Sequence, residues 1–409
     1  MSLIRPFRGL RPKTDFAEDV IAPPYDVLNT EEARERAAGR PHSFLHISKP
    51  EIDLPVGTDP FDPSVYAKGA ENLNKLIAEQ ILIREDKPVY YAYQLDMNGH
   101  KQSGLVATAS VKDYDSNRIR KHEYTRPDKE DDRLKQIDAL NAQTGPVFLT
   151  YRHDQTVDGV VSKAMQQTPL YDLTADDGVQ HTIWIIDDEN DIATLTSSFD
   201  AMNCVYIADG HHRSASASRV SAMRKGTVAG DSHEYFLTVI FPDNQMNILD
   251  YNRVVKDLNG MSADDFLAQC AERFDIEKSD GQMKPEKVNE FGMYLDKQWY
   301  RLTIKDEFVP ASDPVGRLDV SLLQNNLITP ILNIDDPRRD KRIDFVGGIR
   351  GLGELEKRVD SGEMKVAFSL YPTQLSDLMD VADAEEVMPP KSTWFEPKLA
   401  DGLVSHVLD

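Results

Sequence analysis

The sequence is poor in features that would place it outside the ordinary globular proteins. Two cysteines, Cys204 and Cys270, are too few for a disulfide framework, and no CxxC spacing is present for structural zinc. No apolar run approaches the roughly 18 residues that span a bilayer, and Met1 to Arg11 does not resemble a signal peptide. We therefore expect a cytoplasmic protein that is not associated with membranes.

Basic residues are outnumbered by acidic ones, with 47 Lys and Arg against 69 Asp and Glu. The formal net charge is -22, whereas a nucleic-acid surface needs concentrated lysine and arginine, so a nucleic-acid partner is not expected. Ser-x-x-Lys, HExxH and GxSxG motifs are absent, which disfavours serine hydrolases and zinc proteases. With 40% hydrophobic and 28% charged residues over 409 positions, the composition predicts a folded chain of more than one lobe.

The hydrophobic patterns predict a mixed fold of the α/β and α+β type. Asn98-Gly99 separates two β-rich runs and predicts a tight hairpin, and Asn29 with Glu32 predicts a helix with a capping box. Further strands and helices alternate up to about residue 241, which favours a sheet covered by helices. The expected strands are 16–22, 89–95, 104–111, 147–151, 182–186, 204–208, 235–241, 343–346 and 365–370. The expected later helices include 263–274 and 320–327.

A soft boundary near Leu258 divides the chain into two lobes that we expect to pack closely. Residues 1–258 are interpreted as a core lobe that binds a phosphate group or a nucleotide, and residues 259–409 as an α+β lobe.

The most informative segment is Asp209-Gly210-His211-His212-Arg213, where a hydrophobic strand turns into a helix. The first backbone N–H groups of a helix are unpaired and lie at the positive end of its dipole, so an anion binds there readily. Gly210 is expected to let a ligand approach the backbone, while Arg213 and the two histidines add donors for phosphate. The alternative is a plain surface turn in which Asp209 caps the helix.

A second candidate cluster, Lys121-His122-Glu123-Tyr124-Thr125, lies between a strand and a helix. Glu123 is a candidate general base or magnesium ligand, Lys121 can offset phosphate charge, and Arg133 from the next helix is a candidate neighbour. A solvated charged loop is the alternative.

Two further candidates stand in proline-containing segments. Pro23 and Pro24 precede Tyr25 and Asp26 and would hold these two side chains in a rigid loop, although a structural turn explains them equally well. Lys391-Ser392-Thr393 near the carboxyl end is not a Walker A loop, because no glycine precedes the lysine. The alternative is a terminal segment docked by its aromatic residues.

These segments together resemble the bacterial and archaeal family catalogued as domain of unknown function 1015. The matching segments run from end to end: Ile4 to Phe7, Ala22 to Val27, Lys121 to Thr125, Asp132-Arg133, Ala208 to Arg213 and Met388 to Lys398. The family's name implies no activity.

The turn from Asp209 to Arg213 also resembles the turn of the ParB/sulfiredoxin superfamily, whose members place nucleotide phosphates at a helix start after Gly-x-x-Arg. This resemblance implies a ParB/sulfiredoxin-like core with insertions. His211 stands where sulfiredoxin-like proteins carry their reactive cysteine, which disfavours redox repair. The acidic charge disfavours the DNA-binding branch. Free-serine kinases, another branch, imply phosphoryl transfer between a nucleotide and an amino-acid hydroxyl.

Three hypotheses follow. The first is a phosphotransferase that uses ATP or ADP with Mg²⁺ on a small hydroxylated metabolite, with serine or phosphoserine the leading choice by resemblance, and with self-association as a homodimer left open. The second is a nucleotide-binding regulatory protein without catalysis. The third is a metal-assisted hydrolase in which His122, Glu123, His211 and His212 converge on a metal.

The first hypothesis assigns a role to each candidate residue. The phosphate-binding residues are Asp209, Gly210, His211, His212 and Arg213. The catalytic candidates are Glu123, Asp26, Lys121 and His122, with Glu123 and Asp209 as magnesium ligands. The candidates for substrate binding are Tyr25, Thr125, Arg133 and Lys391.

Overall fold

A computed structural model describes residues 2–409, and its contacts divide the chain into two compact units. Unit 1 comprises residues 1–246 together with 397–409, and unit 2 comprises residues 247–396. The expected boundary near Leu258 is therefore wrong on two counts. The chain passes from unit 1 into unit 2 before the strand β14 (Tyr251–Val255), which belongs to the sheet of unit 2. The last residues belong to unit 1, because they pair with its strands.

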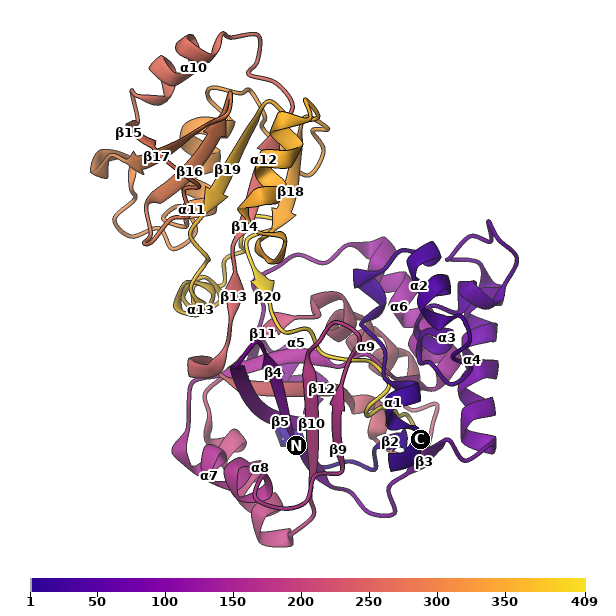
Figure 1. The fold of residues 1–409 in the computed structure, drawn as a ribbon. Helices are drawn as coiled ribbons and strands as arrows, with labels where there is room; N and C mark the ends of the chain where they lie inside the picture. The colour runs from indigo at the N-terminus through magenta and orange to yellow at the C-terminus, as the bar shows by residue number, and fades with distance from the viewer. Residues whose placement is uncertain (1) are drawn as a thin grey trace. The chain divides into compact units, whose positions relative to one another are not determined.

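Unit 1 is built on a nine-stranded mixed sheet, which confirms the predicted α/β class (Figure 1). The strand order is β6-β11-β8-β12-β5-β4-β10-β9, with β1 paired to β5. Only the pairs β6/β11 and β8/β12 are parallel among the described strands of this sheet. The strands are β1 Ile4–Arg5, β4 Tyr90–Met97, β5 His100–Ser110, β6 Ile119–Arg120, β8 Val147–Tyr151, β9 Tyr171–Thr174, β10 Gln180–Ile186, β11 Val205–Asp209 and β12 Tyr235–Pro242.

Helices cover this sheet and form a second core beside it. Helices α7 (Gln155–Ala164) and α8 (Glu189–Ala201) lie side by side (Figure 1) and bury Val157, Leu195 and Phe199 against the sheet. The second core is formed by three short helices, the 16-residue helix α4 and two small strand pairs. These elements are α1 Ala17–Val20, α2 Thr30–Ala37, α3 Leu45–Ser48, α4 Pro63–Ala78, β2 Leu10–Pro12 with β3 Leu82–Arg84, and β7 Ala142–Gln143 with β21 His406–Val407.

The remaining helices of unit 1 lead to the predicted site. They are α5 (Val111–Asp115), α6 (Pro127–Leu140) and α9 (His211–Arg224). Helices α6 and α9 pack on each other, and Ile137 and Val220 share a small apolar cluster. The side of α6 that carries Ile137 therefore contacts α9.

Unit 2 holds a six-stranded antiparallel sheet in the order β15-β17-β16-β19-β14-β18. Its other strands are β15 Phe274–Ser279, β16 Glu290–Leu295, β17 Gln298–Ile304, β18 Ile343–Gly347 and β19 Val366–Leu370, with a small pair β13 Ile248–Leu249 and β20 Trp394–Phe395. Its helices are α10 Ala263–Cys270, α11 Asp319–Leu323, α12 Leu352–Asp360 and α13 Leu375–Asp383. Asp296 and Lys297 form the tight turn between β16 and β17, where Leu295 lies opposite Gln298.

Two predicted elements differ in the structure. The expected strand at 16–22 is the short helix α1, because Ala17 and Val20 face the core three residues apart, which is helical spacing. The expected helix 263–274 ends at Cys270, since Phe274 begins β15 and pairs with Ile304.

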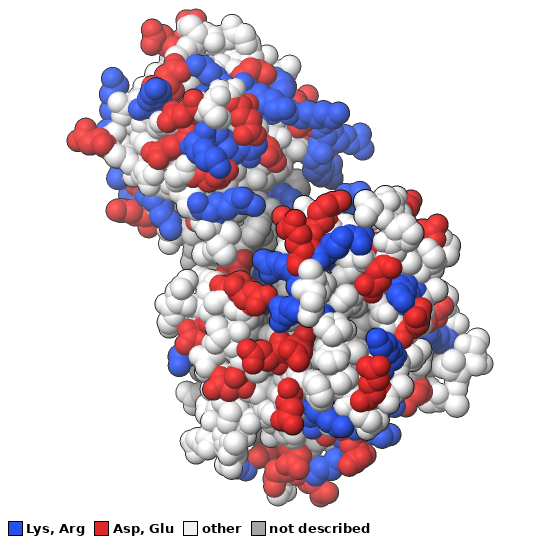
Figure 2. Space-filling view, turned by 45° about the vertical axis from the view of Figure 1, so that its right-hand side comes forward, with Lys and Arg blue, Asp and Glu red and all other residues white. Residues whose placement is uncertain are grey.

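Acidic and basic side chains are interspersed on the face of each unit seen in Figure 2. Within residues 2–409, none of the helices combines the length and the apolar character needed to cross a bilayer.

Candidate functional site

The two predicted clusters meet because two strands run in parallel. Tyr206 of β11 lies opposite Arg120 of β6, so both strands end at the same edge of the sheet. Lys121, His122 and Glu123 follow β6, and the turn at Asp209 follows β11. The structure thus brings together two segments that are almost 90 residues apart.

Gly210 makes the turn from β11 into α9. Its φ of 97° lies in the left-handed region, which side chains other than glycine rarely adopt. Its N–H donates to Oδ1 of Asp209 (2.8 Å), and no side chain caps the helix. The first helical backbone bond runs from the Ser214 N–H to the Gly210 carbonyl. The preceding amides of α9 therefore form the kind of helix end that binds anions.

Space at Gly210 is not open, however. A Cβ at this position would lie 3.2 Å from Nε and 3.3 Å from Cζ of Arg213. The guanidinium of Arg213 therefore lies against the glycine, on the side where a Cβ would stand. An anion reaching the helix amides would contact this guanidinium as well.

Arg213 itself is largely buried rather than a surface residue. Its side chain is 12% exposed, donates from Nη1 to the Pro146 carbonyl and lies 3.7 Å from the Asp209 carboxylate. Burial opposes its charge, but Asp209 and Asp26 raise the pKa of the guanidinium above its usual value. The cation therefore belongs to a buried ionic network.

Asp209 carries the compensating charge. Burial disfavours its ionised form, but Lys398, at 3.7 Å, and Arg213 outweigh burial and lower the pKa to about 2. Asp209 is hence a carboxylate at any ordinary pH. Lys398 comes from the returning C-terminal segment, and sequence reasoning did not select it as a site residue.

His211 lies between the two clusters. Its Nε2 accepts a long hydrogen bond from the His122 N–H (3.4 Å), and its Nδ1 lies 3.6 Å from Oε2 of Glu123. Burial, and then the neighbouring His122, lower its pKa well below the usual value. The ring is therefore neutral, and the hydrogen-bond pattern assigns its proton to Nδ1, which faces Glu123.

Glu123 is the accessible member of this group, with its side chain 55% exposed. His122, in contrast, is buried. Its ring packs edge-on against the ring of His211, with 4.4 Å between the ring centres, and burial lowers its pKa to about 4. A neutral, enclosed imidazole suits support of the loop better than proton transfer with a bound substrate.

Three further candidates make hydrogen bonds within the protein: His212, Lys121 and Thr125. The Arg126 N–H donates to Nε2 of His212 (3.1 Å), which ties the loop to α9. Nζ of Lys121 donates to the Tyr114 carbonyl (2.9 Å) and lies over the Tyr114 ring, and burial lowers its pKa. The Thr125 hydroxyl donates to Glu130. These contacts position the loop.

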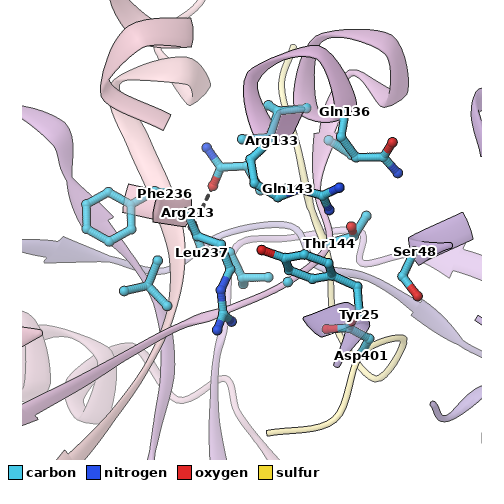
Figure 3. A pocket seen from close by; sticks show the side chains of 14 residues that line it. Tyr25, Ser48, Arg133, Gln136, Gln143, Thr144, Arg213, Phe236, Leu237 and Asp401 are labelled. Carbon is cyan, nitrogen blue, oxygen red and sulfur yellow. Dashed lines mark hydrogen bonds between the residues drawn. The ribbon is translucent and has the colours of Figure 1, made fainter. Parts of the chain in front are cut away.

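A small cavity of about 40 Å³ lies behind Arg213, roughly the room for one water molecule (Figure 3). Tyr25 lies between Arg133 and Asp401, with the Arg133 guanidinium 4.0 Å from the centre of the tyrosine ring. Arg133 is in turn ion-paired with Asp132 at 2.7 Å. The cavity can hold water but is too small for a nucleotide or a metabolite.

Asp401 is the second residue that sequence reasoning missed. Burial raises its pKa to about 7, although Arg213 opposes this effect. Asp26, in the 3-10 turn Tyr25–Val27, interacts electrostatically with both Arg213 and Asp401. No local sequence signal near the C-terminus marks Asp401, because its neighbours come from distant segments.

Lys391 and the proposed metal site are two further predictions. Lys391 lies in unit 2, where its Nζ is 5.6 Å from the centre of the Tyr251 ring. No three His, Cys, Asp or Glu side chains in the described part of the chain are grouped as a metal site. The convergence of His122, Glu123, His211 and His212 that the hydrolase hypothesis requires is therefore not found.

Solved structures with some likeness to this chain have TM-scores of only 0.36. They include a free serine kinase in complex with AMP (11% identity, covering 71% of this chain and 86% of that one). A conserved hypothetical protein from Pyrococcus furiosus (13%, covering 72% and 93%) and SbnI with a C-terminal truncation from Staphylococcus aureus (10%, covering 72% and 84%) are also similar.

A search of curated proteins finds no match. The family profile described as "Protein of unknown function (DUF1015)" matches residues 4–321, which is well over half of the chain. The chain therefore belongs to the DUF1015 family.

Proposed function

We propose that unit 1 binds a nucleotide and transfers a phosphoryl group to or from the hydroxyl of a small metabolite, with serine or phosphoserine the leading choice by resemblance. One observation carries the proposal. An uncapped helix start has the Arg213 guanidinium against Gly210 and Lys398 3.7 Å from Asp209, the residue before this glycine. It lies next to an accessible carboxylate, Glu123, that a neutral histidine contacts. A phosphate site beside a base is what phosphoryl transfer requires.

The roles follow from the contacts. The amides of His211 to Arg213 and the remaining donors of the Arg213 guanidinium would hold phosphate oxygens. Glu123 would accept the proton of the acceptor hydroxyl, whose oxygen forms a bond to the γ-phosphorus while the bond to the nucleoside diphosphate breaks. His211, through its Nδ1–H, would orient the Glu123 carboxylate.

Magnesium fits the donors available. Mg²⁺ is usually held by one or two carboxylates together with substrate phosphates, and Asp209 and Glu123 offer carboxylate oxygens beside the helix start. When bound, the ion neutralises charge on the phosphates. Asp26 is the less suited base, because it lies within the network of Arg213 and Asp401.

The test uses phosphorus NMR with ATP or ADP, Mg²⁺ and a panel of hydroxylated metabolites that includes serine and phosphoserine. We expect turnover by the parent and by Glu189→Gln, a control on an exposed helix start. Glu123→Gln should retain nucleotide binding in calorimetry while losing about 100-fold or more in rate, the usual contribution of a general base. Turnover that persists unchanged in Glu123→Gln contradicts the assignment.

The regulatory hypothesis predicts a different pattern. In that case nucleotide binds and changes the scattering profile or oligomeric state, including formation of a homodimer, but no product appears over hours. Absence of nucleotide binding by the folded protein would remove both hypotheses.

A further inference from the structure

Unit 2 contains a cavity of about 200 Å³ that the proposed function does not use. This volume corresponds to roughly six water molecules, since each takes about 30 Å³ in the liquid. Its wall combines apolar residues with a few polar ones. The residues that matter here are Asn289, Arg317, Leu318, Asp319, Pro372 and Asp377.

Asp319 is the unusual group in this wall. Its Oδ1 accepts a hydrogen bond from the Asn289 N–H (2.9 Å), whereas its Oδ2 is buried and has no hydrogen-bond partner. A buried carboxylate oxygen without a partner is costly, and such groups are uncommon in folded proteins. A ligand with an N–H donor would satisfy it.

The charges around Asp319 favour a cationic donor. Asp377 also lines the cavity, and Glu290 interacts with Asp319 electrostatically. Burial, followed by these two acids, raises the pKa of Asp319 to about 7, and burial also raises the pKa of Asp377. The cation in the wall, Arg317, is ion-paired with Asp380 at 2.5 Å and also interacts electrostatically with Asp377.

The size and lining of the cavity favour an organic cation over a metal ion as its ligand. Val309, Pro310, Leu318 and Pro372 form an apolar part of the wall that a bare ion would not use. The described residues offer no group of three or more acidic, histidine or cysteine side chains for a metal. An alkyl chain of a few carbons would cover the apolar part while its charged end met the acids.

We propose that this cavity in unit 2 is a binding site for a small primary alkylamine, with the ammonium group held by Asp319 and Asp377. The site is independent of the phosphate chemistry proposed for unit 1. An ammonium has three donors, so one group can satisfy Oδ2 of Asp319 and still reach a second carboxylate.

The test is calorimetry of the full chain at pH 8 with n-butylamine and 1,4-diaminobutane. n-Butanol serves as the uncharged probe, and Mg²⁺ and Ca²⁺ as the competing cations. We expect at least one amine to bind and n-butanol not to bind. Asp319→Asn and Asp377→Asn should each weaken amine binding about tenfold or more, because each removes a charge-assisted contact.

Two features keep the test interpretable. Asp319→Asn retains an oxygen for the Asn289 N–H, and its folding is checked by its melting temperature. Asp264→Asn, on an exposed turn of α10, is the matched control and should bind amines as the parent does. The proposal is overturned if neither amine binds the folded parent, if n-butanol binds equally well, if the ions bind in preference, or if Asp319→Asn binds amines unchanged.

Discussion

Arg213 has structural contacts in unit 1 in addition to the phosphate-binding role that we propose for it. Its guanidinium lies 3.7 Å from the Asp209 carboxylate, interacts electrostatically with the buried Asp401, and donates to the Pro146 carbonyl. A surface arginine would make none of these contacts. The same residue is therefore expected to contribute to folding as well as to phosphate binding.

We expect Arg213→Ala to destabilise the protein by about 3 to 5 kcal/mol, the usual cost of leaving a buried charge without its partner. Arg213→Lys keeps the charge and should lose less stability, but it cannot reproduce the fork of donors for phosphate. Urea denaturation of both variants checks this. A loss below about 1 kcal/mol for Arg213→Ala would instead indicate an exposed side chain.

Asp401 gives unit 1 a dependence on pH. Its pKa is raised to about 7 in the folded protein, against about 3.9 for an ordinary aspartate. The folded state therefore holds a proton that the unfolded state has released between these two values, so stability falls as pH rises through this window and levels off above it.

We expect Asp401→Asn to remove this part of the pH dependence. Relative to the parent, the variant should gain stability as pH increases from about 4 to 7, since Asn does not ionise. Unfolding free energies measured at several pH values test the prediction. Parallel curves for parent and variant would show that Asp401 has an ordinary pKa.

At the scale of elements, the turn between β11 and α9 depends on one glycine. The φ of 97° at Gly210 costs a residue with a side chain about 1 to 2 kcal/mol, and an added Cβ would press on the Arg213 guanidinium. We expect Gly210→Ala to lose at least this much stability and to weaken nucleotide binding, because Arg213 must move.

Gly159 offers the matched control. It lies on an exposed face inside helix α7, and a Cβ there would meet nothing within 4 Å. Gly159→Ala should therefore stabilise the protein by about 0.5 to 1 kcal/mol without affecting binding. Calorimetric melts and nucleotide titrations of the two variants decide the matter, and equal effects at both positions would argue against a special turn at Gly210.

At the scale of the whole molecule, the last residues of the chain complete unit 1. Ser405 exchanges backbone hydrogen bonds with Leu10, and β21 pairs with β7. Leu403, Val404 and Leu408 are buried. Each buried side chain of this kind is worth about 1.5 to 3 kcal/mol.

A chain ending at Glu396 should therefore lose several kcal/mol of stability in unit 1, while unit 2, whose residues are all retained, keeps its own transition. Differential scanning calorimetry separates the unfolding transitions of the two units. Asp409→Asn, which removes only the exposed ion pair with Arg84, should cost at most about 1 kcal/mol. An unchanged unit 1 transition in the truncated chain would show that the segment is dispensable.

The sequence by itself determined the local elements. The Asn98-Gly99 hairpin, the capping box at Asn29 and the helix start after Gly210 were all predictable, because turn residues and helix caps act over a few residues. It also singled out two clusters that the structure brings together, Lys121 to Thr125 and Asp209 to Arg213.

Only the tertiary structure decided how these residues are used. The parallel pairing of β6 with β11 sets His211 beside Glu123, and the returning C-terminal segment supplies Lys398 and Asp401. Burial turned Arg213 from an expected surface ligand into part of an ionic network. Pairing and burial depend on contacts between distant residues, and local sequence patterns carry no record of those contacts.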